Sequence, residues 1–248
     1  ILVDASIHGE YTSNAPLWQW MADYARDKGL GLHIHVSETQ AEHQASLDRH
    51  GATPIRALDC FGVWDIRAIA AHCVWTTPED WAIMAEKGIA CAHNPVSNLK
   101  LGSGVAPIPD MLRAGVTVAL GTDGVASNNA TDLFGEMKFA ATIHPGVRRD
   151  PLAIRPMDVL RMATCDGAKA LGRKAGRIQP GYIADLILVD FHRPNLTPCH
   201  SAADNLVYSA TGRDVVMTMA RGKVLYKDGI FFTLDLERIR REVEPYAL

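Results

Sequence analysis

Short apolar segments alternate with segments of helical periodicity over much of the chain. Five segments are rich in β-branched or apolar residues and have the length of buried strands, at residues 1–7, 31–37, 68–74, 89–93 and 116–122. Amphipathic segments of helical period occur at residues 15–28, 77–87, 107–114, 133–143 and 156–171. This alternation is typical of βα units around a parallel sheet.

The pattern changes after Gly172, where Gly and Pro residues become frequent. Apolar stretches at residues 183–190 and 215–226 predict antiparallel strands rather than another βα unit. A charged helix is predicted at about residues 234–244. A closed barrel of eight βα units is a common parallel fold, and it needs three strands more than the five predicted here.

Composition limits the classes of partner. The 25 Lys and Arg residues balance against 28 Asp and Glu residues, and they are scattered, which argues against a nucleic-acid partner. No apolar run approaches the ~20 residues of a bilayer span, so no membrane partner is expected. The five cysteines form no CxxC pair, and we interpret them as reduced thiols, which favours the cytoplasm.

Ligand-capable side chains gather at the carboxyl ends of the predicted strands. One histidine in an apolar strand is usually a packed core residue. Several strand ends that each carry His, Glu or Asp favour a chemical site instead, because barrel active sites are built from these ends. The residues concerned are His33, His35, Glu38, His72, His93 and Asp123.

The runs that contain these residues resemble methylthioadenosine/S-adenosylhomocysteine deaminases of the amidohydrolase superfamily. They are HVSET at 35–39, AHCV at 71–74, HNPVSNLKLGSG at 93–104 and GTDGVASNN at 121–129, with IHGEYTS at 7–13 and GYIADL at 181–186 in support. The resemblance extends over nearly the whole chain. It implies an α/β fold, a (β/α)8 metallo-dependent hydrolase barrel of which this chain holds about the last five βα units, plus part of a small β-sandwich domain. The implied domains are a partial barrel at 1–175, the C-terminal part of the sandwich at 176–230 and a C-terminal helix at 231–248.

The resemblance also implies a role for each residue of the candidate site. His35 is a metal ligand, and neutral imidazole binds divalent zinc or iron well. Asp123 is a second ligand that accepts a proton from the attacking water and also contacts the substrate. Glu38 binds the substrate and carries a proton to its purine ring. His72 stabilises charge in the tetrahedral intermediate, and His8 contacts the sugar side of the substrate.

The HxH metal pair that opens the first barrel strand of this superfamily is not found. His33 and His35 share one face of a strand, but only three further barrel strands follow them, so we read His33 as an interior residue of a deeper layer. His93 is not assigned as a ligand; it shapes the pocket or caps the turn that follows it. We therefore expect two more ligands and three strands upstream, in a longer parent protein.

The predicted function is metal-dependent hydrolytic deamination of adenosine-type nucleosides, with methylthioadenosine or S-adenosylhomocysteine as substrate. The cofactor is one divalent ion, zinc by preference, with iron or manganese as alternatives. Two alternatives stay open: a guanine-type deaminase or triazine chlorohydrolase of the same superfamily, and a non-catalytic fragment. The partner expected is a small nucleoside, and homo-oligomer formation is left open.

Overall fold

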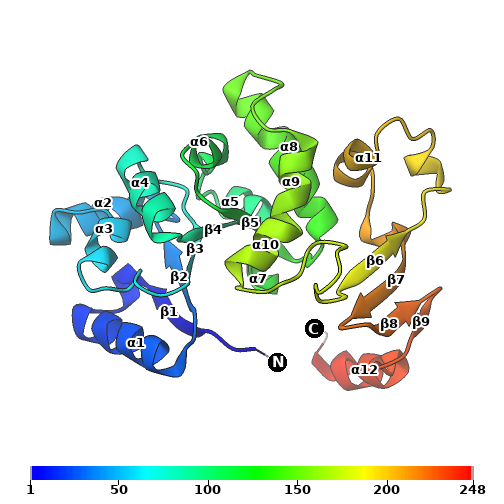
Figure 1. The fold of residues 1–248 in the computed structure, drawn as a ribbon, viewed down its shortest axis with the longest axis horizontal. Helices are drawn as coiled ribbons and strands as arrows, with labels where there is room; N and C mark the ends of the chain where they lie inside the picture. Colours follow the sequence, from blue (N-terminus) through cyan, green and yellow to red (C-terminus); the bar gives the residue numbers. More distant parts are fainter. Residues whose placement is uncertain (1, 247–248) are drawn as a thin grey trace.

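The computed structural model describes residues 2–246, and its larger sheet is parallel (Figure 1). The strands follow one another in chain order across this sheet, each paired with the next. The prediction of βα units is confirmed, although each strand is shorter than predicted and Ile1 lies outside the described residues. The strands are β1 (Ala5–Gly9), β2 (Leu32–Val36), β3 (Ala68–His72), β4 (Ala90–His93) and β5 (Val118–Leu120).

Helices follow the strands of this sheet. The start of α4 agrees with the sequence, because the Thr77 side chain accepts a hydrogen bond from the Asp80 N–H, the Asp80 side chain accepts one from the Thr77 N–H, and Pro78 occupies the first turn. The helices are α1 (Ala15–Lys28), α2 (Gln40–His50), α3 (Pro54–Asp59), α4 (Pro78–Lys87), α5 (Pro95–Lys100), α6 (Ile108–Arg113), α7 (Val125–Asn128), α8 (Leu133–Arg148), α9 (Pro156–Met162) and α10 (Cys165–Ala170).

Two helices differ from their predicted bounds. The segment predicted as one helix at 156–171 is divided into α9 and α10, because Thr164 has φ −128° and ψ −96°, outside the helical region. Helix α8 continues past Ile143 and contains Pro145 in its last turn, where the missing N–H removes one backbone hydrogen bond. Neither change moves a strand end.

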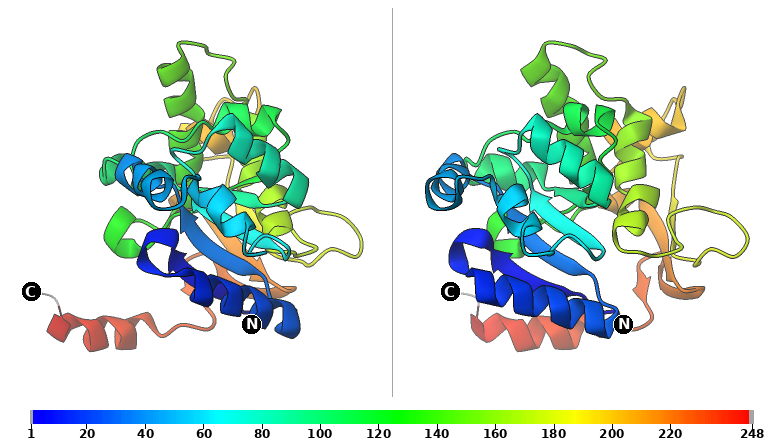
Figure 2. Two further views of the ribbon diagram at one scale, coloured as in Figure 1. Left: turned by 90° about the vertical axis from the view of Figure 1, so that its left-hand side faces the viewer. Right: turned by 60° about the vertical axis from the view of Figure 1, so that its left-hand side comes forward.

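The second sheet is antiparallel and confirms the change of pattern after Gly172. Its strands, in spatial order, are β6 (Leu186–Val189), β7 (Val215–Ala220), β8 (Lys223–Lys227) and β9 (Ile230–Phe231). A helix, α11 (Ala202–Tyr208), lies between β6 and β7, and α12 (Leu236–Val243) extends away from the rest of the chain (Figure 2). The domain boundaries remain predictions.

The two faces of the parallel sheet are covered unequally. Ile7, Leu32 and Ile34 point into the main core, with exposures of 3% or less. On the opposite face of β1 and β2, Ser6 and His33 are exposed. Among residues 2–246 the sheet ends at β1 and β5 and does not close on itself. The uncovered face is the one that lines the interior in a closed barrel.

Two further features of the described residues are the state of the cysteines and the length of the helices. All five cysteines, each within the described residues, are free, and Cys73 and Cys91 are buried in the core. None of the helices in residues 2–246 combines the length and the apolar character that a bilayer span requires.

Candidate functional site

Unusual backbone conformations mark the strand ends that carry the candidate residues. Ser37 after β2, His72 at the end of β3 and Asp123 after β5 have φ values of 48°, 71° and 60°. Non-glycine residues adopt positive φ rarely, and such strain is concentrated at functional sites. The strand ends are therefore shaped to present specific side chains.

The side chains from β1, β2 and β3 contact one another. The His35 ring lies 5.0 Å from the His8 ring and 5.3 Å from the His72 ring, centroid to centroid. The Glu38 carboxyl lies beyond His72, with Oε2 3.8 Å from His72 Nε2. The structure thus brings together His8, His35, Glu38 and His72, as the sequence predicts.

His35 is oriented by a backbone group. Its Nδ1 lies 2.5 Å from the carbonyl oxygen of His8. Because a carbonyl only accepts hydrogen bonds, Nδ1 carries the proton, and in the neutral ring Nε2 keeps its lone pair. This arrangement is the one that metal-binding histidines commonly show, so His35 fits the role of a ligand.

The His72 ring is buried and is held in place through Nδ1. Its Nδ1 lies 2.8 Å from Asn98 Oδ1, and only 1% of its side chain is exposed. With Nδ1 hydrogen bonded to Asn98, Nε2 faces Glu38. Their 3.8 Å separation is too long for a direct hydrogen bond and leaves the two groups free to bind a third. Glu38 Oε1 accepts a hydrogen bond from Ser103 Oγ at 3.1 Å.

Asp123 is hydrogen bonded through both carboxyl oxygens. Ser97 Oγ donates to Oδ2 at 2.5 Å, and the Gly124 N–H donates to Oδ1 at 2.6 Å. Partial burial acts to raise the pKa of Asp123, but these hydrogen bonds and the nearby His72 and His35 rings outweigh it and lower the pKa. A carboxylate offers about four acceptor positions, so the ionised group retains sites for a metal ion or a water.

A buried carboxyl group organises the loops beside Asp123. Glu136 on α8 is 1% exposed, and it accepts hydrogen bonds from the Val96 N–H at 3.2 Å and from Asn128 Nδ2 at 2.6 Å. Val96 precedes Ser97 on α5, so Glu136 holds the segment that donates to Asp123. The sequence reasoning missed Ser97 and Glu136. Ser97 lies inside the run at 93–104, and its polar character was the available signal.

His93 and His33 differ from the other strand-end histidines. His93 is buried, and its Nε2 lies 3.2 Å from Nε2 of His144 on α8. Burial lowers the pKa of both rings, that of His93 well below its usual range and that of His144 to about 4, which keeps them neutral. His93 thus binds another histidine and does not cap the turn. His33 lies on the uncovered face of β2, the face that lines the interior of a closed barrel, and its place in a deeper interior layer stays a prediction.

The candidate metal ligands do not form a complete set in the described residues. Within residues 2–246, no group of three or more His, Cys, Asp or Glu side chains is arranged to hold a metal ion. Catalytic zinc sites normally use at least three protein ligands. The donor chemistry of His35 and Asp123 fits a divalent ion, but these two residues are an incomplete ligand set.

Comparisons with known proteins agree with this arrangement. A model of the amidohydrolase family matches residues 1–225. A 5'-deoxyadenosine deaminase of Methanosarcina mazei is 44% identical over 245 residues, which are 98% of this chain and 57% of the relative. A 5-methylthioadenosine/S-adenosylhomocysteine deaminase of Dictyoglomus thermophilum is 44% identical over 241 residues, which are 97% of this chain and 57% of the relative. The zinc-bound structure of an adenosine deaminase from Xanthomonas campestris matches with a TM-score of 0.95 at 33% identity, over 98% of this chain and 56% of that one. The chain therefore spans somewhat more than half the length of these proteins.

Proposed function

The chain belongs to the amidohydrolase family, and from this we propose that the whole protein is a metal-dependent deaminase of adenosine-type nucleosides. The substrates we propose are 5'-methylthioadenosine and S-adenosylhomocysteine, which give the inosine analogue and ammonia. The observation that carries the proposal is the placement of Glu38 Oε2 3.8 Å from Nε2 of the buried His72, beside a His35 ring whose Nε2 is free. The names of the matched relatives support the choice of substrate.

We propose that His35 and Asp123, with further ligands from the rest of the protein, hold one divalent ion, zinc by preference over iron or manganese. When bound, such an ion lowers the pKa of the attacking water towards about 7. Asp123 accepts the proton of that water. Glu38 donates a proton to the purine ring as the water oxygen attacks the carbon that bears the amino group.

The remaining residues bind and orient. His72 donates a hydrogen bond from Nε2 to the developing oxyanion, a contribution that is strongest in a buried, preorganised position. The contact of Nδ1 with Asn98 Oδ1 at 2.8 Å holds the ring so that Nε2 points towards this position. His8 is exposed beside His35, and we assign it to the sugar side of the substrate.

The alternatives are less well supported. A guanine-type deaminase or a triazine chlorohydrolase needs a similar metal site, but the curated relatives that match nearly the whole chain are named as adenosine-type nucleoside deaminases. A non-catalytic fragment has no use for a His35 ring oriented by a carbonyl. We propose a cytoplasmic location and small-molecule substrates, and self-association stays open.

A substrate panel tests the proposed function. The intact parent, loaded with zinc, should convert methylthioadenosine, S-adenosylhomocysteine or 5'-deoxyadenosine to the hypoxanthine product, followed by ultraviolet absorbance and ammonia release. Guanine and a chlorotriazine should give no turnover. Turnover of guanine or release of chloride, with no change in the adenosine-type substrates, would assign the protein to one of the alternative activities.

A further inference from the structure

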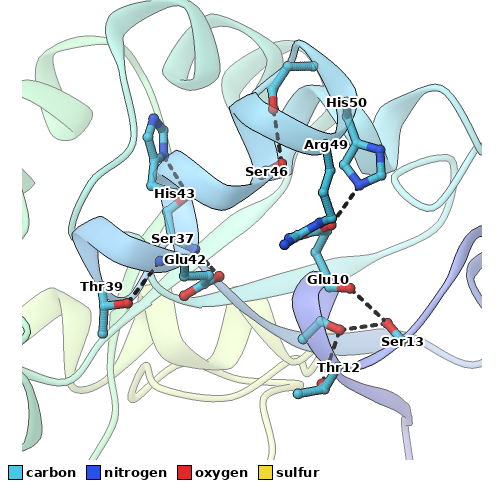
Figure 3. A network of polar contacts seen from close by, with 12 residues as sticks. Glu10, Thr12, Ser13, Ser37, Thr39, Glu42, His43, Ser46, Arg49 and His50 are labelled. Atoms are coloured by element: carbon cyan, nitrogen blue, oxygen red, sulfur yellow. Dashed lines mark hydrogen bonds and ion pairs between the residues drawn. The ribbon is translucent and has the colours of Figure 1, made fainter.

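A second buried carboxyl group, Glu10, lies close to the candidate site and has no part in the proposed chemistry. Its side chain is 1% exposed. It accepts hydrogen bonds from Arg49 Nη2 at 2.6 Å and from His50 Nε2 at 2.8 Å, both from the last residues of α2 (Figure 3). Burial of a carboxylate is unfavourable unless such partners are present, so these contacts tie the segment after β1 to the end of α2.

The other end of α2 is tied to the segment after β2. Glu42, in the first turn of α2, accepts a hydrogen bond from the backbone N–H of Ser37 at 2.8 Å (Figure 3). It accepts a second one from the backbone N–H of Glu38, also at 2.8 Å. Ser37 has positive φ, and these hydrogen bonds stabilise the turn that carries Glu38. Helix α2 therefore spans from the end of β2 to the end of β1.

The end of β1 contains an irregularity at the residue that orients His35. Ile7 pairs with Ile34 but Gly9 pairs with His35, so His8 is an extra residue, a β-bulge. Bulges redirect groups away from the regular ladder and are frequent beside active sites. The His8 carbonyl accepts the Nδ1 proton of His35 at 2.5 Å.

The segment just after the bulge is held independently of α2. Ser13 Oγ donates to the Gly9 carbonyl at 2.6 Å and accepts from Trp18 Nε1 at 2.6 Å. The bulge is thus fixed from the side of α1 by Ser13 and Trp18. Glu10 is the group that fixes it from the side of α2.

We propose that Glu10 is a positioning residue for His35. Through Arg49 and His50 it holds the bulge against α2, so that the His8 carbonyl selects the His35 tautomer with the proton on Nδ1 and leaves Nε2 available to a metal ion. The proposal rests on the role of His35 as a ligand in the proposed function. The contacts connect in a ring. The turn after His35 is hydrogen bonded to Glu42 at the start of α2, the end of α2 is hydrogen bonded to Glu10, and the His8 carbonyl just before Glu10 contacts His35.

The tautomer of His35 can be read in the metal-free 248-residue chain from the ¹⁵N chemical shifts of its ring nitrogens. In the neutral ring the protonated and the unprotonated nitrogen differ in chemical shift, so the shifts separate the two tautomers. The chain should show a protonated Nδ1 and an unprotonated Nε2. In Glu10→Gln the amide NH₂ group faces either Arg49 or His50, so one of the two hydrogen bonds to residue 10 is lost. The ratio of the two His35 tautomers should then shift towards the Nε2–H form roughly 5- to 10-fold, the effect of losing about one hydrogen bond.

A second variant and a control complete the test. Arg49→Gln, at a residue with 43% of its side chain exposed, should shift the ratio in the same direction with little risk to folding. Arg26→Gln removes the exposed ion pair with Asp23 and should leave the ratio unchanged. An unprotonated Nδ1 in the original chain, or an unchanged ratio in both Glu10→Gln and Arg49→Gln, would overturn the proposal. Because the measurement needs no turnover, failure of the proposed function would leave its result unaffected.

Discussion

Glu38→Gln in the intact parent is expected to retain the metal ion and to lose roughly 10²–10⁴-fold of its turnover, the usual contribution of a general acid-base group. The amide has the same shape, and its oxygen can still accept the hydrogen bond from Ser103 Oγ, which lies 3.1 Å from Oε1. An amide cannot donate and recover a proton as the carboxyl group does. The loss should therefore fall on kcat, with metal content unchanged.

The rate and metal content of Glu38→Gln are to be compared with those of Glu79→Gln, a change at an exposed residue in the first turn of α4. The control should keep both at the level of the original protein. A near-native rate for Glu38→Gln would remove Glu38 from the mechanism.

The 248-residue chain alone, supplied with zinc, is expected to show no measurable deamination. Within residues 2–246 no three His, Cys, Asp or Glu side chains are arranged to hold a metal ion, and two ligands hold a catalytic ion weakly. Weak binding also leaves the attacking water poorly oriented, so activity falls more steeply than occupancy. The uncovered face of β1 and β2, with His33 exposed, leaves water free to enter.

The upstream segment of the proposed parent, added in cis or in trans, should restore turnover, followed by the ultraviolet change of adenine to hypoxanthine. Robust activity from the chain alone would mean that His33 and His35 are themselves the metal pair. That result would require a new assignment of the strands.

The order of the strands and the residues at their ends could be predicted because both are visible as local patterns in the sequence. A buried strand is a short apolar run, and His35, His72 and Asp123 each interrupt or follow such a run. Parallel strands place those interruptions on one edge of the sheet. The clustering of His8, His35, Glu38 and His72 follows from these local signals.

Helix α2 could not be predicted in the same way. Its sequence is polar, and it buries Glu42 and Ser46 rather than an apolar stripe. Its stability comes from caps and from its contacts with Glu10, which lies 39 residues before Arg49 in the chain. Periodicity does not record such contacts.

Two features of the site also depend on distant or irregular pairing. The bulge at His8 adds one residue without altering the alternation of buried and exposed residues in the strand. The sequence therefore gives no sign that the His8 carbonyl orients His35. The partner of His93 is His144, 51 residues later on α8. Side-chain pairs of this kind arise from packing of the folded chain.

The zinc content of the intact parent tests the central claim, that His35 rather than His33 holds the metal. The original protein should bind about one zinc ion per subunit, measured by elemental analysis after dialysis. His35→Gln should lose most of this zinc together with its activity. His33→Gln, two residues away on the same strand face, should keep both. Full zinc content in His35→Gln, with loss in His33→Gln, would contradict the account.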